Sequence, residues 1–302
     1  MGAWRSWVGV NGGVLLVATL VQCSSYLVRA ATGSPVAAAV ACTAVLYVLA
    51  YALASGNLRG RPRTVRERGQ TRSIALWSIA AHPIGSACER LIHEAHLAGG
   101  GAAGIGEALV STGLLGATRP LLAASGTACA LVGAASVWWV LLTLRLFAFE
   151  IAFDGLFYFA HRACHAHPLV YRLVHKLHHR HTHDVSLISA LQMGPLDVIA
   201  THTLPVLGAL WLVPLAPGIE LSIAKTYLLF QEFYGHAGVE HRGRNFGPAP
   251  GVARALGIEL RAEDHQRHHI SAHVNFSKRF SLFDRLFGTW DGAGCAGQSR
   301  AD

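Results

Sequence analysis

Charged residues are scarce in this sequence. Asp, Glu, Lys and Arg together make up 14% of the 302 residues, against about 25% in soluble globular domains. Hydrophobic residues make up 52% of the chain. A chain with so little charge and so much apolar character is a poor candidate for a soluble domain, and it is predicted to be an integral membrane protein.

Paired cysteines are also missing. The six cysteines form no CxxC pair and no regular spacing, which argues against a disulfide framework or a cysteine-rich zinc site and predicts buried thiols.

A nucleotide-binding fingerprint is lacking too. The glycines of 99–108 have a loose GxGxxG-like spacing, but no predicted strand precedes them. Electrons for any redox reaction are therefore expected from another protein.

The net charge of +8 comes without a nucleic-acid recognition motif, so we expect no nucleic-acid partner. Six arginines lie between residues 59 and 72 beside a single acid, Glu67, directly after an apolar stretch. The positive-inside rule places this loop in the cytoplasm. Lysine is rare and arginine common, as in G+C-rich genomes, so the expected location is a bacterial inner membrane.

Long apolar runs predict several membrane-spanning helices. A helix crosses the bilayer with roughly 20 apolar residues, and Gly9–Leu27 and Val36–Ala54 satisfy this condition. The run Ala123–Ala160 would be about 57 Å long as one helix, longer than the ~30 Å apolar layer. We therefore predict a hairpin with its turn near Leu142–Arg145. Two further apolar runs flank PLAPG at 214–218 and predict another hairpin.

These runs predict an all-α, multi-pass bundle with about six spans in three hairpins. Segment 74–122 is less apolar and predicts an interfacial helix and a loop, with His93 and His96 at the membrane surface. Three hairpins return the chain to the cytoplasm before each histidine cluster. We expect N-terminal membrane helices in 1–144, a catalytic domain in 145–291 and a tail in 292–302.

Histidine is concentrated far beyond its usual frequency. Residues 161–183 hold eight of the eighteen histidines. The spacings are HxxxH at 161 and 165, HxxHH at 175–179, and HxxHH again at 265–269. On a helix these offsets place side chains on one face, where unpaired buried imidazoles would each cost free energy. A bound cation removes this cost, and eight ligands are too many for one ion, so the pattern predicts two metal ions.

The segments DGLFYFAHRACH, HKLHHRHTH, HAG, HQRHH and NFSKRFSLFDRLFGT together resemble the fatty acid hydroxylase/sterol desaturase superfamily. The resemblance covers residues 145–291. It implies an O2-dependent oxidoreductase of the membrane with two iron ions and a cytoplasmic histidine-rich cap. The metal ligands that it implies by position are His161, His165, His175, His178, His179, His265, His268 and His269.

Two further residues are candidate ligands. His236, in YGHAG, is expected as a ninth ligand, and Glu232 precedes it by one helical turn. Glu232 either binds a metal or pairs with another group. The remaining histidines of the dense stretch, His167, His181 and His183, are expected to be bystanders.

Acidic and aromatic side chains are predicted to orient the ligands, since a metal-bound histidine usually donates its second N–H to an oxygen. The candidates are Asp154, Tyr158, Asp264 and Asp284. His202, within an apolar run, is a weaker candidate for a substrate or supporting role. Many relatives carry a His-Pro-x-Glu element after the second box, whereas this chain has MGPLD with Asp197. The departure leaves the role of that element open.

The resemblance implies hydroxylation of an unactivated C–H bond of a lipid, with a ferredoxin or a cytochrome b5-like protein and its reductase as electron donor. Desaturation at the same site is the alternative. A metal transporter is a more distant one, disfavoured because transport sites usually lie near the middle of the membrane, whereas these clusters follow apolar runs. Substrate identity stays open among fatty acyl chains, sterols and related lipids.

Overall fold

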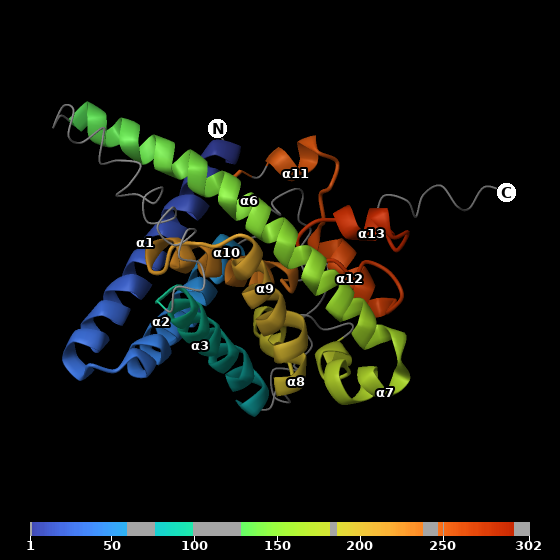
Figure 1. The fold of residues 1–302 in the computed structure, drawn as a ribbon. Helices are drawn as coiled ribbons and strands as arrows, with labels where there is room; N and C mark the ends of the chain where they lie inside the picture. Colours follow the sequence, from blue (N-terminus) through green and yellow to red (C-terminus); the bar gives the residue numbers. More distant parts are fainter. Residues whose placement is uncertain are drawn as a thin grey trace.

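The computed structural model describes residues 2–58, 76–98, 128–181, 186–237, 247–249 and 251–292. Helices dominate these residues, and in the described ranges the only β pairing is an isolated bridge between Glu259 and Phe280. Long helices gather at one end of the molecule and short elements at the other (Figure 1). The predicted all-α class is therefore confirmed. The arginine-rich loop and the glycines of 99–108 lie outside the described residues.

Helices α1 (Gly2–Thr32) and α2 (Pro35–Leu58) form the first predicted hairpin. Gly33 makes the turn with φ +67°, and the Ser34 hydroxyl accepts from the amide of Ala37 at the start of α2. The two helices pack against each other and bury mainly valines and alanines, while other large apolar side chains such as Leu16 and Tyr26 face outward. An apolar outer surface of this kind is suited to lipid rather than to water.

Helix α6 (Ala128–Ala166) is continuous for 39 residues, so the hairpin predicted near Leu142–Arg145 is wrong. Figure 1 shows α6 as one unbroken helix across the molecule. Residues 134–154 contain no glycine or proline to end a helix. Arg145 need not reach a membrane surface, because it pairs with Glu220 of α10 at 2.5 Å.

The described residues contain four helical segments that are long and apolar enough to cross a membrane, rather than the predicted six. They are Trp7–Thr32, Pro35–Leu58, Val132–Ala166 and Pro195–Leu212. The predicted return of the chain before each histidine cluster assumed a hairpin inside α6, so that argument for cytoplasmic placement no longer holds. The side of the membrane remains a prediction from the arginine cluster alone.

The hairpin predicted around residues 214–218 is present. Its first arm consists of α8 (Pro195–Asp197), the π-helix η5 (Val198–Thr203) and α9 (Leu204–Leu212). Gly218, with φ +94°, leads into the second arm, α10 (Ile219–Gly235). Almost every residue of α10 is buried, including three ionisable ones that have partners on neighbouring elements.

Helix α3 (Leu76–Ala98) buries its polar face. Glu89 is fully buried and its Oε2 lies 2.5 Å from Lys225 Nζ of α10. His93 is also buried, with its Nε2 2.9 Å from the Leu215 carbonyl oxygen, so its side chain faces the protein interior. His96 is exposed. An apolar outer face and a buried polar face are the opposite of a soluble amphipathic helix.

The short elements complete the end of the molecule that follows α6. They are α7 (Pro168–Val170), the π-helix η2 (Tyr171–His175), the 3-10 helices η3 (His178–His181) and η4 (Leu187–Leu191), α11 (Gly251–Ala255), α12 (Ala262–Ile270) and α13 (Leu282–Leu286). Buried thiols are found at Cys42 and Cys164, whereas Cys23 and Cys88 are exposed. The prediction of buried cysteines is thus right for two of these four.

Candidate metal centre

The first histidine box lies in the last turns of α6. His161 and His165 are one turn apart and share a helix face, as the i, i+4 spacing predicts. The ring of His161 is buried, and its Nδ1 lies 2.7 Å from the carbonyl oxygen of Phe276. The end of a long rigid helix therefore fixes the first pair of imidazoles.

The second box departs from the regular helix that its spacing predicts. Its first histidine, His175, ends the π-helix η2, in which the amide of Lys176 donates to the carbonyl of Tyr171 at 2.7 Å. A turn and the 3-10 helix η3 follow, and they carry His178 and His179. All three rings are buried. The change of helix type points His175 and His179 to one side and His178 to the other.

Helix α12 carries the third box and divides it in the same way. His265 and His269 are one turn apart, with their Nε2 atoms separated by 3.2 Å. His268 projects elsewhere, with its Nε2 3.2 Å from the Nε2 of His179. Each HxxHH box therefore supplies histidines to two separate groups, whereas the sequence argument placed each box on a single face.

Nine buried or half-buried histidines form two groups. Within each group, one ring nitrogen of every member lies within 4.8 Å of those of the other members. The first group has five members: His161, His165, His175, His179 and His268. The second group has four: His178, His236, His265 and His269. The structure thus brings together all eight histidines of the boxes, together with the expected ninth. Division into two groups agrees with the prediction of two metal ions.

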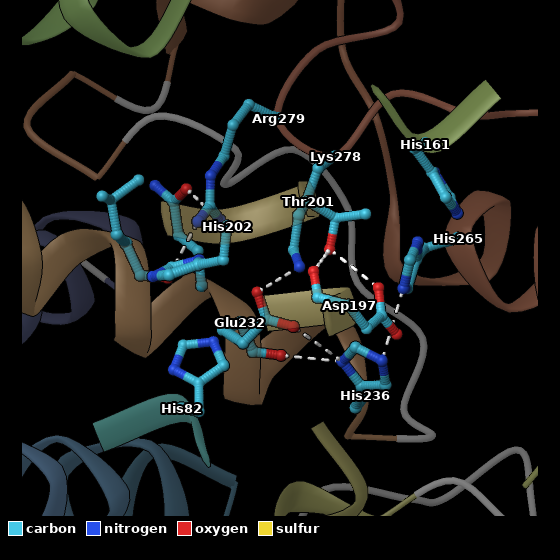
Figure 2. Close-up of polar contacts among 12 residues, drawn as sticks. His82, His161, Asp197, Thr201, His202, Glu232, His236, His265, Lys278 and Arg279 are labelled. Carbon is cyan, nitrogen blue, oxygen red and sulfur yellow. Dashed lines mark hydrogen bonds and ion pairs between the residues drawn. The ribbon is translucent and has the colours of Figure 1, made fainter. Parts of the chain in front are cut away.

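His236 completes the second group from the C-terminal end of α10. Its Nδ1 lies 3.0 Å from the carbonyl oxygen of Glu232, and its Nε2 lies 3.4 Å from the Nε2 of His265. Figure 2 shows His236 between Glu232 and His265. The turn after α10 therefore returns the chain to the histidines of α12.

The ring orientations favour metal binding over mutual hydrogen bonding. His161 and His175 each direct Nδ1 at an oxygen, the Phe276 carbonyl and the Asp197 carboxylate respectively. In a neutral ring the proton is then on Nδ1, and Nε2 holds a lone pair. The two Nε2 atoms nonetheless face each other at 2.9 Å. Two lone pairs repel at that separation, unless a cation accepts both, and bonds of about 2.1 Å place two ligand nitrogens roughly 3 Å apart.

Comparison with known proteins gives a consistent result. Residues 146–289 match the family model described as Fatty acid hydroxylase. These residues are therefore similar to the fatty acid hydroxylase family. The match begins inside α6 and ends just after α13, so it encloses all nine histidines of the two groups. Helices α1, α2 and α3 lie outside it.

Curated relatives include Fatty acid hydroxylase vlmA of Lecanicillium sp, 28% identical over half of this chain and 43% of that protein. C-4 methylsterol oxidase erg25 of Schizosaccharomyces pombe is 30% identical over 45% of this chain and 43% of its own length. The human Fatty acid hydroxylase domain-containing protein 2 is 37% identical over 28% of this chain and 23% of its own. The chain thus spans less than half the length of these relatives. No solved structure matches the chain.

The MGPLD segment of the matched region has a defined structural role, which the sequence argument left open. Asp197 is fully buried, and its Oδ1 lies 2.8 Å from His175 Nδ1. The hydroxyl of Thr201, one turn later, donates to the same oxygen at 3.0 Å. A carboxylate in this position fixes the orientation and tautomer of a metal-binding histidine. Because Asp197 is 22 residues from His175, only the fold reveals the pair.

Glu232 forms an ion pair and lies outside both histidine groups. Its Oε2 lies 2.5 Å from Lys278 Nζ, its Oε1 lies 3.7 Å from His236 Nδ1, and it is a member of neither group. Burial alone would raise the pKa of Glu232, but the charges of Lys278 and His236 outweigh it and lower the pKa to about 2. The dashed contacts of Figure 2 join Lys278, Glu232 and His236 in this order.

Two histidines of the third box, His265 and His268, are kept neutral by their surroundings. Burial lowers the pKa of His268 to about 3, and burial also lowers the pKa of His265 well below its usual value. A neutral imidazole offers a lone pair to a metal, whereas a protonated one does not. These two rings are therefore in the protonation state that binds metal at physiological pH.

The predicted supporting acids Asp154, Asp284 and Asp264 accept hydrogen bonds from backbone amides. Asp154 accepts from the amides of residues 278, 279 and 280. Asp284 accepts from the amides of Phe276 and Ser277. Both acids therefore fix the loop that carries the Phe276 carbonyl, and their effect on His161 is indirect. Asp264 accepts from the amide of Arg261 at the start of α12.

Tyr158 and the other histidines lie outside the two groups. The Tyr158 hydroxyl lies 3.0 Å from Thr289 and accepts from Arg162, so it ties α6 to the loop after α13. His167 caps α7 and is exposed. His202 is buried against His82 and Glu89. His273 is exposed. The side chains of His181, His183 and His241 lie outside the described residues.

Proposed function

We propose that this chain is a membrane-bound, non-haem di-iron oxygenase that hydroxylates an unactivated C–H bond of a lipid. The observation that carries the proposal is the opposed pair of Nε2 atoms of His161 and His175, within two groups of nine histidines. Imidazole ligands suit iron and leave no need for cysteine. The family of the matched domain and the names of its relatives support lipid oxidation.

The residues present fit two iron ions. His161, His165, His175, His179 and His268 would hold one ion, and His178, His236, His265 and His269 the other. Bound iron supplies the reduction of O2 and the oxidation of the C–H bond. The chain itself supplies neutral ligands, an oriented His175 and a water-poor surrounding. Phe276, for example, packs against the rings of His161, His165 and His268.

The proposal includes an external electron donor, since one hydroxylation consumes O2, two electrons and two protons. A ferredoxin, or a cytochrome b5-like protein with its reductase, is the class of donor that fits. The lipid substrate would reach the site from the bilayer, because the domain begins within one candidate span and contains another. A fatty acyl chain, a sterol or a related lipid is the proposed substrate class.

The test begins with the metal. The full chain is purified in lipid nanodiscs and its iron is counted per polypeptide, for the parent and for His178→Ala. The exposed histidine of the same stretch supplies the control, His167→Ala. We expect about two irons in the parent and in the control, and loss of iron in His178→Ala without loss of membrane insertion. Equal iron in His178→Ala and the parent would refute the ligand assignment.

Product analysis then decides the reaction. The reduced protein is exposed to O2 with lipid extracts, and products are identified by mass spectrometry. A product with one added oxygen atom supports hydroxylation. A product lacking two hydrogen atoms would instead make the chain a desaturase with the same site. Metal-dependent flux into vesicles without O2 consumption would overturn the enzyme proposal in favour of transport.

A further inference from the structure

The segment between the first two histidine boxes has two dissimilar faces. Residues 168–180 comprise α7, η2 and the start of η3. One face carries the second box, with His175, His178 and His179 between 2% and 6% exposed. The same short segment therefore supplies three members of the metal centre, and its position decides where those three rings lie.

The opposite face is apolar and open. Leu169 is 47% exposed, Val170 38% and Leu173 65%. Leu169 and Leu173 are one turn apart, so they lie side by side on the outer face. Three large apolar side chains in five residues are more than scattered surface hydrophobics, and they indicate contact with an apolar phase or a partner.

Positive charge follows directly along the same outer face. Arg172, Lys176 and Arg180 are exposed, and in the part of the chain that the structure describes no carboxylate pairs with them. The sequence from 155 to 183 contains no Asp or Glu at all. Leucine followed by unpaired arginine and lysine is the pattern of an interfacial element whose apolar side chains enter the acyl boundary and whose cations stay among the headgroups.

The neighbours of the segment place it where two membrane spans end. It follows immediately on α6, whose residues Val132–Ala166 form a candidate span. Its η2 packs against α8, which begins the candidate span Pro195–Leu212. Figure 1 shows α7 beyond the last turn of α6, with α8 near it. A segment that lies between the same-side ends of two candidate spans is suitably placed to meet the headgroup layer.

We propose that residues 168–180 dock on an anionic lipid surface, with Leu169, Val170 and Leu173 in the acyl boundary and Arg172, Lys176 and Arg180 on lipid phosphates. The ligand is thus an anionic phospholipid, recognised by charge and by apolar insertion. Docking holds the inner face of the segment, and so the second histidine box, against the rest of the centre. This lipid contact is separate from the binding of the lipid that the protein is proposed to oxidise, and it does not depend on the proposed reaction.

The experiment uses the full chain in nanodiscs of phosphatidylcholine alone or with one third phosphatidylglycerol. An environment-sensitive fluorescent amino acid is incorporated in place of Leu173, and its quenching by lipids brominated near the headgroup is measured. Leu256 provides the matched control position, because it is also exposed, at 57%, but follows α11 on another part of the molecule. The charge variant is Arg172→Gln/Lys176→Gln/Arg180→Gln, and Arg254→Gln, at an exposed arginine of α11, is its control.

We expect strong quenching at 173, weak quenching at 256, and stronger quenching at 173 when phosphatidylglycerol is present. Each cation near an anionic surface changes the docked population by about fivefold. The triple variant should therefore lose the phosphatidylglycerol effect, and Arg254→Gln should keep it. Equal quenching at 173 and 256 would overturn the proposal. Quenching at position 173 that is the same with and without phosphatidylglycerol would also overturn the proposal. Crosslinking of position 173 to a second copy of the chain instead of to lipid would do so as well.

Discussion

Removal of the Asp197 carboxylate should weaken one metal site and spare the other. Asp197 is fully buried and accepts a 2.8 Å hydrogen bond from His175, which is itself 2% exposed. A buried hydrogen bond to a charged group is worth about 1.5–3 kcal/mol. Loss of an outer partner of a metal-binding histidine typically lowers metal affinity by about 10–100-fold. The two estimates agree, since about 1.4 kcal/mol corresponds to each factor of ten.

The two substitutions at this position should differ in size. In Asp197→Asn the side-chain oxygen still accepts from His175 but the charge is lost, so we expect iron affinity to fall about tenfold. In Asp197→Ala no acceptor remains, and we expect a fall of about 100-fold. Only the first group contains His175, so half of the iron should become easier to remove by a chelator.

Chelator competition with iron counting is the assay, and a double-mutant cycle is its control. In a His175→Gln background the Asp197→Asn change should have little further effect, because the pair acts through one contact. Thr201→Val removes only a neutral hydrogen bond to Asp197 and should change affinity less. Equal loss of both irons in Asp197→Ala, or unchanged affinity, would show that Asp197 does not act through His175.

Three further predictions follow from buried charges. Glu89→Gln removes the carboxylate that lies 2.5 Å from Lys225 and should lower the free energy of unfolding by about 3–5 kcal/mol, whereas the double variant Glu89→Met/Lys225→Met should recover most of that loss. Thermal unfolding in detergent measures the stability of both variants, and equal stability of the two would contradict the pairing. Glu232→Gln should keep two irons by metal analysis, since Glu232 pairs with Lys278; one iron would make it a ligand. The metal-free protein should lose stability as pH falls from about 6.5 towards 3, because His268 binds a proton in the unfolded chain but stays neutral in the folded one, where its pKa is about 3. Each such histidine lowers the free energy of unfolding by about 1.4 kcal/mol for each pH unit in this range. An unfolding free energy that does not change with pH would contradict this prediction.

The sequence determined the chemistry of the site, because ligand chemistry is local. The spacing of the boxes identified eight histidines, and the position of His236 after an apolar run added the ninth. The lengths of the apolar runs and the turn residues between them are also local features, and they predicted the α1–α2 and α9–α10 hairpins. Length alone misled within α6, where a 39-residue helix crosses the molecule and Arg145 is neutralised by Glu220.

Tertiary structure alone decided which histidines share a group and what holds them. A π-helix and a 3-10 helix divide the second box, and helix type of this kind depends on packing rather than on residue spacing. Asp197 reaches His175, and Lys278 reaches Glu232, across segments far apart in the chain. The buried polar face of α3 is likewise explained only by Lys225 and its neighbours on α10. Pairs of this kind are set by three-dimensional contact between charges, and contact between distant segments has no local signature in a single sequence.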